Sequence, residues 1–258
     1  MVEYFIDHAD PPEVKGRIAG AIAPHAGYVY SGAVAGFTYR ALRDNAVRHP
    51  ITTAIILGFT HRSSFRGVAL MDGDAIRTPL GETALDQETG RALIEASSKA
   101  ARWHYSPHFG EWSAENQIPF VQAALPNTRL VVGLFGDHDH STVTAMIHAL
   151  ATVTRNQSFV IIASTDMLHD PDYAKVTRID HETLKLTSAM DAASIGARWS
   201  GDEQIFCGLM PVLTVLGTTA ALGCRKGTLL HYRNSGDDFP ESRGEWVVGY
   251  GSMVFTVS

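Results

Sequence analysis

Histidines follow four apolar runs that the sequence predicts as buried strands. They occur in PHAGY (24–28), GFTH (58–61), GDHDH (136–140) and STDMLH (164–169). Ligands in open α/β sheets bind beyond the carboxyl ends of the strands, so side chains that directly follow strands are the first candidates for a site. One histidine in a loop is weak evidence, because loops are polar in most proteins. Four such loops together favour a functional site at one edge of the sheet.

The residue types in these loops suit metal binding or proton transfer. Neutral imidazoles such as those of His25 and His61 are common ligands of transition metals. His138 and His140 straddle Asp139 and could also chelate an ion, although a solvated polar loop is the simpler explanation. The alternatives therefore stay open at this point.

The chain carries two cysteines, Cys207 and Cys224, which are too few for a disulfide framework in a protein of 258 residues. A free cysteine is most often an inert buried residue, and Cys224 is interpreted in that way. From the residues alone, Cys207 has the same interpretation.

Apolar periodicity predicts the elements that must position these residues. The predicted strands are Arg17–Ala23, Thr53–Gly58, Arg129–Phe135, Ser158–Ala163, Thr228–Tyr232 and Val247–Val257. The predicted helices are Ser31–Arg43, Ser141–Val153, Asp180–Asp191 and Pro211–Leu222. This alternation predicts an α/β fold with a mostly parallel or mixed central sheet and helices on both faces. The lack of a linker or repeat favours one domain over residues 1–258.

Composition excludes several classes of partner. The formal net charge is -6 without long blocks of like charge, so the sequence predicts no binding to nucleic acid or to a membrane surface. The N-terminal MVEYFIDHAD is acidic where a signal peptide is basic, and no apolar stretch reaches the roughly 20 residues that span a bilayer. A cytoplasmic location is the expectation, and no phosphate-binding glycine pattern indicates a nucleotide.

The motifs IAPHAGYVYSG, LGFTH, EWSAENQIPF, STDMLHD, FCGLMPV and VVGYGSMVF follow one another along nearly the whole chain. In this order they resemble the Memo family, which includes protein B of the AmmeMemoRadiSam system. The resemblance implies a fold similar to that of class III extradiol dioxygenases, and a functional link to a radical-SAM protein.

The resemblance also implies site residues. His25, His61 and Cys207 correspond to the family's metal ligands, and a divalent ion is implied, with iron(II) favoured and copper or zinc as alternatives. His169 is implied as an acid/base group with Asp166 as its orienter. Glu111 is a candidate catalytic acid, expected on a helix with Glu115.

Two departures from related proteins affect these expectations. Relatives commonly have histidine after the glutamate of the EWSAENQIPF motif, where this chain has Trp112. The extradiol dioxygenases use two histidines and a carboxylate, so a thiolate at Cys207 weakens the case for dioxygenase activity.

Three functions remain open on this basis. The first is a metal-dependent redox or dioxygenase-like enzyme of undefined substrate. The second is a non-catalytic protein that handles metal or binds a small molecule or phosphopeptide, because an animal relative is associated with phosphotyrosine-peptide recognition. The third is a cysteine hydrolase or transferase with Cys207 as nucleophile.

Overall fold

Nine strands form the central sheet of the computed structural model, which describes residues 1–155, 157–199 and 203–257. The strand order is β10-β11-β1-β8-β2-β7-β3-β6, and β9 pairs with β11. These strands are β1 (Arg17–Ala23), β2 (Thr53–Phe59), β3 (Val68–Leu70), β6 (Ala101–Trp103), β7 (Arg129–Phe135), β8 (Phe159–Ser164), β9 (His169–Asp170), β10 (Gly227–Asn234) and β11 (Val247–Val257). A separate hairpin consists of β4 (Ala75–Thr78) and β5 (Gly81–Ala84).

The middle of the sheet is parallel, and this arrangement positions the site. β1, β8, β2 and β7 are neighbours that run in the same direction, whereas β3, β10 and β11 add antiparallel pairs on either side. The carboxyl ends of β1, β8 and β2 therefore meet at one edge of the sheet. The loops that follow them carry His25, Asp166 and His61.

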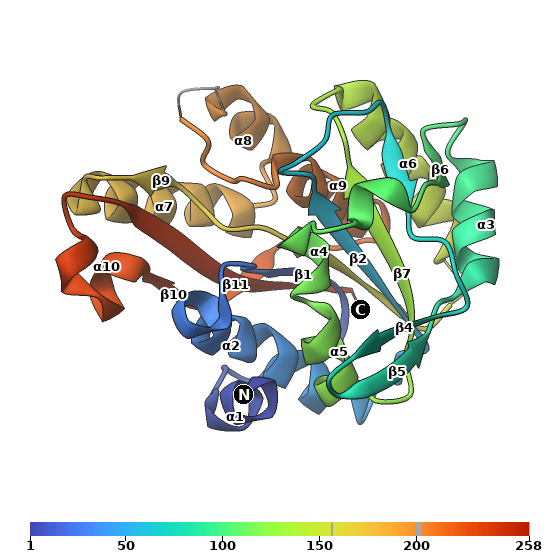
Figure 1. The fold of residues 1–258 in the computed structure, drawn as a ribbon, viewed down its shortest axis with the longest axis horizontal. Coiled ribbons are helices and arrows are strands. Elements are labelled where there is room, and N and C mark those ends of the chain that lie inside the picture. The colour runs from blue at the N-terminus through green and yellow to red at the C-terminus, as the bar shows by residue number, and fades with distance from the viewer. Residues whose placement is uncertain (156, 200–202, 258) are drawn as a thin grey trace.

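Helices cover both faces of the sheet (Figure 1). One face packs against α1 (Val2–His8), α2 (Tyr28–Ala46), α4 (Trp112–Glu115) and α5 (Ile118–Ala124). The opposite face packs against α3 (Gln87–Ala96), α6 (His140–Val153), α7 (Tyr173–Ser188), α8 (Ala192–Arg198) and α9 (Leu209–Ala221). The short elements α10 (Ser235–Asp238), η1 (Ser106–His108) and η2 (Pro240–Ser242) complete the chain. The predicted single-domain α/β fold with a mixed sheet is confirmed.

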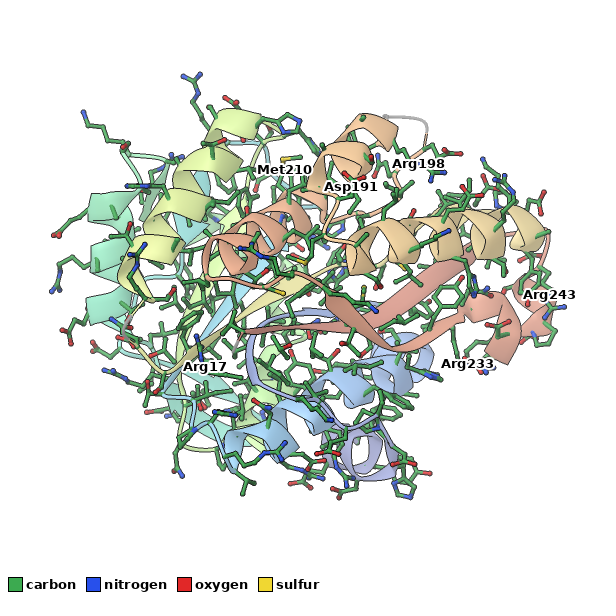
Figure 2. All side chains as sticks on the ribbon, turned by 180° about the vertical axis from the view of Figure 1, so that it is seen from behind. Arg17, Asp191, Arg198, Met210, Arg233 and Arg243 are labelled. Atoms are coloured by element: carbon green, nitrogen blue, oxygen red, sulfur yellow. The ribbon has the colours of Figure 1, made fainter. Side chains whose placement is uncertain are left out.

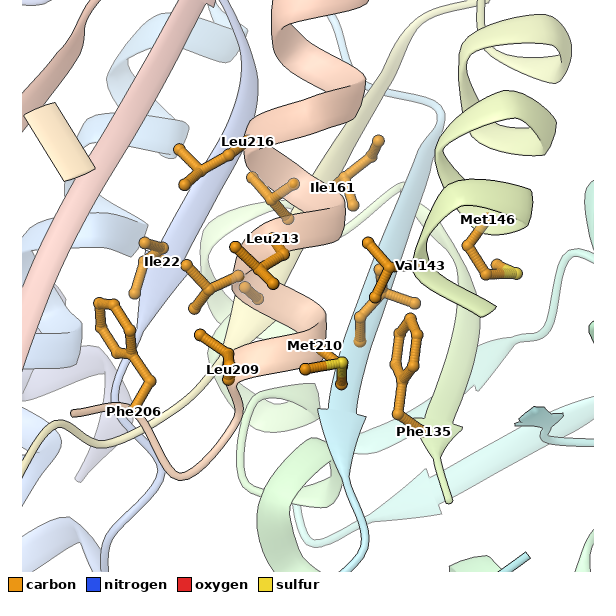
Figure 3. Packing of buried hydrophobic residues seen from close by; sticks show 14 of the residues in the cluster. Ile22, Phe135, Val143, Met146, Ile161, Phe206, Leu209, Met210, Leu213 and Leu216 are labelled. Carbon is orange, nitrogen blue, oxygen red and sulfur yellow. The ribbon is translucent and has the colours of Figure 1, made fainter. Parts of the chain in front are cut away.

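Helix α9 packs over the middle of the sheet on the face that also carries α3, α6, α7 and α8. Its Leu209, Leu213 and Leu216 lie over Ile22 of β1 and Ile161 of β8 in the close-up of the core (Figure 3). Seen from behind, Met210 of α9 and Asp191 at the start of α8 lie on this same side of the molecule (Figure 2). Within the described ranges, no helix is both long and apolar enough to cross a lipid bilayer.

All four predicted helices have different bounds in the structure, and α2 and α7 differ most. α2 begins at Tyr28 rather than Ser31, and the Ser31 hydroxyl donates to the carbonyl of Ala26 instead of capping the helix. α7 spans Tyr173–Ser188 rather than Asp180–Asp191, because the Asp172 carboxylate caps its start. Asp191 caps the next helix by accepting a hydrogen bond from the Ser194 N–H.

A buried carboxyl group on α7 supports the long strand β11. Asp180 is fully buried, and its two oxygens accept hydrogen bonds from the Tyr232 hydroxyl at 2.8 Å and the Leu168 N–H at 3.2 Å. A methyl group at Gly249 of β11 would overlap with Oδ2 of Asp180, so glycine is needed there. Burial raises the pKa of Asp180 to about 7, although both hydrogen bonds oppose the shift.

The raised pKa of Asp180 predicts a pH-dependent contribution to stability. The folded state holds the proton more tightly than the unfolded chain, so this contribution is present below the ordinary pKa of 3.8 and is lost as pH rises through about 7. Between pH ~4 and pH ~7.5, the wild-type protein should lose on the order of 4 kcal/mol of its free energy of unfolding through this group. The Asp180→Asn variant should lack this loss. Urea titrations across this range measure it, with exposed Glu95→Gln as the control. Parallel pH profiles for the wild type and Asp180→Asn would contradict the assignment.

Candidate metal centre

Three potential ligands converge at the carboxyl edge of the sheet. Among the described residues, the imidazoles of His25 and His61 and the thiol of Cys207 place one ligand atom each within 4.8 Å of one another. His25 follows β1, His61 follows β2, and Cys207 lies just before α9. The structure therefore brings together the three residues that the family resemblance implies as ligands.

His25 is buried, with 2% of its surface exposed, and is fixed on several sides. Its Nε2 lies 3.3 Å from Cys207 Sγ, and its Nδ1 lies 3.2 Å from the hydroxyl of Ser164, the last residue of β8. The His25 backbone N–H donates to Oδ1 of Asp166 at 2.8 Å, and its carbonyl accepts from Nδ2 of Asn116 at 2.8 Å. These contacts leave the ring with a single orientation, in which Nε2 faces the thiol.

His61 is oriented by Glu111. One carboxylate oxygen accepts from His61 Nδ1 at 3.0 Å, and the other accepts from the His61 backbone N–H at 2.6 Å. Glu111 is itself buried, with 2% of its surface exposed, and also caps α4 by accepting from the Ser113 N–H. This pattern fixes the tautomer of a histidine ligand and directs its Nε2 toward the metal. The expectation that Glu111 lies on the helix is wrong, because it precedes α4, and Glu115 at the end of that helix is exposed.

The segment that carries Cys207 is anchored to the core and to β8. The neighbouring Phe206 is buried next to Ile22 (Figure 3). The Cys207 N–H donates to the Asp166 carbonyl, and the Asp166 N–H points at Cys207 Sγ from 3.2 Å. Gly208 follows because a Cβ there would lie 2.8 Å from the Ser164 carbonyl oxygen. The thiol thus receives a backbone N–H, which favours its ionised form.

The charges of the cluster are mutually stabilised. Burial disfavours the Cys207 thiolate, but the adjacent imidazoles of His25 and His61 outweigh burial and lower the pKa of the thiol to about 5. Burial also opposes protonation of His25, yet Cys207 and Asp166 raise its pKa to about 9. His61 behaves alike, with hydrogen bonds to Cys207 and Glu111 raising its pKa to about 10. These shifts favour a Cys207 thiolate that lies between two protonated imidazoles.

Comparison with known proteins identifies the family of the chain. The family described as "Memo-like protein" matches residues 1–254. The chain belongs to this Memo-like family. It is 31% identical to a MEMO1 family protein of Methanopyrus kandleri, covering 99% of this chain and 92% of the relative. It is 33% identical to a relative from Methanothermobacter thermautotrophicus, covering 92% and 84%.

A solved structure shows the same fold at low sequence identity. The crystal structure of an uncharacterised Escherichia coli K12 protein superposes with a TM-score of 0.57 and 13% identity, covering 92% of this chain and 99% of that one. At this identity the likeness concerns the fold alone.

The family resemblance also implies Asp166 and His169 as pocket residues of this Memo-like chain, and the two side chains have different surroundings. The Asp166 carboxylate accepts from the backbone N–H groups of His25 and Ala26, and its second oxygen lies 3.9 Å from His25 Nε2. His169 lies on β9 and presents its ring edge-on to Trp246, with centroids 6.1 Å apart. Its buried Nε2 has no hydrogen-bond partner within the described part of the chain. The acid/base role of His169 and the orienting role of Asp166 stay predictions.

The competing His138–His140 segment has a structural explanation in this member of the family. The His138 ring packs against Phe59 and Trp199, with centroid distances of 4.3 Å and 4.6 Å. Asp139 caps α6 through the Ser141 N–H, and His140 is the first residue of that helix. The packing and the helix cap account for this loop without a metal.

Trp112, at the position where the family resemblance led us to expect histidine, contacts the proposed ligand His61. The two rings stack with centroids 5.1 Å apart and an interplanar angle of 15°. The Arg62 guanidinium lies 5.5 Å from the centroid of the Trp112 ring. The indole of Trp112 therefore covers one face of the His61 ring.

This stacking makes Trp112 a reporter of metal at His61. We expect Cu(II) to quench tryptophan emission, and Trp112→Phe to remove most of that quenching because its ring contacts the ligand. Trp103→Phe is the matched control, since Trp103 packs against Gly90 of α3. Fluorescence titrations of the two variants measure the effect. Equal quenching in Trp112→Phe and the wild type would place the ion away from His61.

Several residues that hold the ligands were not identified from the sequence. Gln117 donates to the Pro24 carbonyl and to the Ser164 hydroxyl, and it accepts from the buried Tyr39 hydroxyl. The hydroxyl of Thr165 accepts from the Gly208 N–H next to Cys207. The only available signal was that the polar residues of EWSAENQIPF and STDMLHD lie next to apolar segments, which does not show which partner each one contacts.

Proposed function

We propose that this Memo-like chain is a metal-dependent redox or oxygen-handling protein in which His25, His61 and Cys207 hold one divalent ion. Iron(II) is the favoured ion, with copper or zinc as alternatives. The observation that carries the proposal is that both imidazoles face Cys207 while their second nitrogens are held, one by Glu111 and the other by Ser164. Hydrogen bonds that fix the orientation of ligand side chains in this way are typical of metal sites.

The donor set fits such an ion. Two imidazoles and a thiolate suit borderline and softer metals, and three protein ligands leave coordination positions for water or a substrate. A bound ion would supply Lewis acidity toward an oxygen atom of the substrate. The side chains of the protein would then fix the ligands, with Glu111 holding His61, while His169 moves a proton and Asp166 restrains the segment that carries His25.

Metal analysis of anaerobically purified protein tests this function. We expect roughly one divalent ion per chain, and Glu111→Gln should weaken metal affinity by about 10- to 100-fold because it loosens His61. Glu115→Gln is the matched control, since Glu115 lies in the same segment but is exposed. The absence of any stoichiometric ion from wild-type protein, even after loading with iron(II), copper or zinc, would overturn the proposal.

A second candidate function is supported by the same contacts. The thiolate of Cys207, the imidazole of His61 and the carboxylate of Glu111 have the relationship of nucleophile, base and orienter in a cysteine hydrolase or transferase. The contact between Glu111 and His61 supplies the orienting carboxylate for this function.

An acyl-transfer assay on metal-free protein separates the two candidates. In the second function, the thiolate attacks p-nitrophenyl acetate, an acetyl thioester forms and p-nitrophenolate leaves in a burst equal to the enzyme concentration. A freed metal ligand would also be acetylated once, so the second function requires turnover beyond the burst, in which water hydrolyses the thioester to acetate and regenerates the thiolate. This turnover should vanish in Cys207→Ser and His61→Ala. Metal-free protein that gives no turnover beyond the burst would leave the metal-dependent function as the better account.

The partners proposed for this chain rest on its family resemblance and not on contacts in its structure. We propose a small-molecule or peptide ligand at the metal centre, and a functional link to a radical-SAM protein. Co-purification with such a protein from cells tests the link.

A further inference from the structure

A cavity lies beside Glu111, the residue that holds the proposed ligand His61. Its volume is about 560 Å³, within the range of small-molecule sites, roughly 300–1,000 Å³. It lies between β4, the 105–111 loop and α4, and Glu111 forms part of its lining. Its apolar walls are formed by Met71, Ile76, Leu85, Ala114 and Val132. This combination can hold the apolar body of a ligand.

The charged groups around the cavity are predominantly acidic. Asp72, Glu111 and Glu115 line it together with the guanidinium of Arg77, and the Arg62 guanidinium lies beside Gly110 of the lining. Arg77 forms an exposed ion pair with Glu82 at 3.0 Å, so a carboxylate also lies beside this guanidinium. Because the Glu111 oxygens already accept from His61 and Ser113, the exposed carboxylates of Asp72 and Glu115 remain for a ligand. A hollow in which one sign of charge predominates attracts ligands of the opposite sign.

Two large aromatic side chains lie exposed among the residues that line this cavity. Phe109 is 80% exposed and Tyr105 is 59% exposed, and both line the cavity from the same loop. Gly110 follows Phe109 with a φ of +71°, a conformation that favours glycine and shapes the turn toward Glu111. Exposed aromatic rings beside carboxylates are the recurring means by which proteins bind organic cations, through the negative faces of the rings.

His108 adds a neutral acceptor to the lining. It is 7% exposed, and its Nε2 lies 3.1 Å from the carbonyl oxygen of Ala69. A carbonyl only accepts, so Nε2 carries the proton and Nδ1 retains a lone pair in the neutral ring. Burial lowers the pKa of His108 to about 4, so the ring is uncharged at neutral pH and does not repel a cation.

We propose that this cavity binds a small organic cation, with its ammonium group at Asp72 and Glu115 and its apolar or aromatic body against Phe109 and the inner walls. None of His25, His61 and Cys207 lines this cavity, so binding there needs no metal and is independent of the function proposed for that cluster. Its outcome therefore does not depend on the metal analysis.

Binding of benzylamine to metal-stripped full-length protein tests the proposal. Benzylamine is protonated at neutral pH, whereas benzyl alcohol is its neutral analogue and benzoate its anionic one. We expect saturable binding of benzylamine in calorimetry, about tenfold tighter than that of benzyl alcohol, and no saturable binding of benzoate. Amide chemical-shift changes on benzylamine addition should centre on the 105–111 loop and β4.

Variants of exposed residues identify the groups responsible without disturbing the fold. The double variant Asp72→Asn, Glu115→Gln should weaken benzylamine binding about tenfold, and Phe109→Ala should weaken it severalfold. The double variant Glu88→Gln, Glu95→Gln, at two exposed acids of α3, removes the same number of charges and should have no effect. Equal affinity for all three probes, or unchanged benzylamine binding in the double variant, would overturn the proposal. Benzylamine binding that requires a bound metal would also overturn it, by placing the amine at the metal centre.

Discussion

Replacing His25 or His61 with alanine is expected to lower the metal content from roughly one divalent ion per chain to less than about a tenth of that. Each substitution removes one of three ligands, a larger loss than the 10- to 100-fold weakening of affinity that removal of an outer contact causes. Elemental analysis after dialysis against a weak chelator measures the result. His61 is the safer test of the two, because its side chain is 29% exposed whereas His25 is buried.

The matched control for this experiment is His138→Ala. His138 also follows a strand of the sheet and is exposed, and it belongs to the competing chelating segment. Its replacement should leave the metal content unchanged, and circular dichroism should show native folds for all three variants. Loss of the ion in His138→Ala, with retention in the other two, would move the metal site to the 136–140 loop.

The strands of the fold could be predicted more accurately than the helices. β1, β7 and β11 have the predicted bounds because each is a continuous apolar run that ends at a polar residue or glycine-containing loop. Helix starts depend on which side chain accepts from a free backbone N–H, and α7 shows the difficulty. Asp172 and Asp191 are both helix N-caps, yet periodicity alone placed Asp191 at the end of a helix. Short elements such as β3 and the β4–β5 hairpin carry too few residues for a periodic signal.

The site could be predicted only in part for a related reason. His25 and His61 were found because the carboxyl ends of parallel strands meet at one edge, which is a rule of backbone geometry. Cys207 precedes a helix instead of following a strand, so only the family resemblance singled it out. The contacts of Glu111 with His61 and of Ser164 with His25 span 50 and 139 residues of sequence. Such contacts depend on side-chain directions that no local pattern encodes.

The second large effect concerns the two thiols, which have different environments. Cys207 is partly accessible; its sulfur accepts from the Asp166 N–H and lies 3.3 Å from His25 Nε2. Cys224 is buried, and its thiol donates to the Lys226 carbonyl at 3.4 Å. Removal of metal with a chelator should accelerate alkylation of Cys207 by iodoacetamide more than about tenfold, because the sulfur is freed as a thiolate. Cys224 should label slowly in both states.

The pH at which this labelling is performed sharpens the test. The pKa of Cys207 near 5 keeps the thiol ionised at pH 6.5, where an ordinary thiol is only about 1% ionised. Metal-free protein should therefore label rapidly at Cys207 even at this pH, as resolved by mass spectrometry of the Cys207 and Cys224 peptides. Circular dichroism confirms that stripping leaves the fold intact. Identical Cys207 labelling in loaded and stripped protein, with the ion demonstrably present in one, would remove this thiol from the ligand set. The contact between His61 and Glu111 would then favour Cys207 as a nucleophile, since the same imidazole would serve as its base.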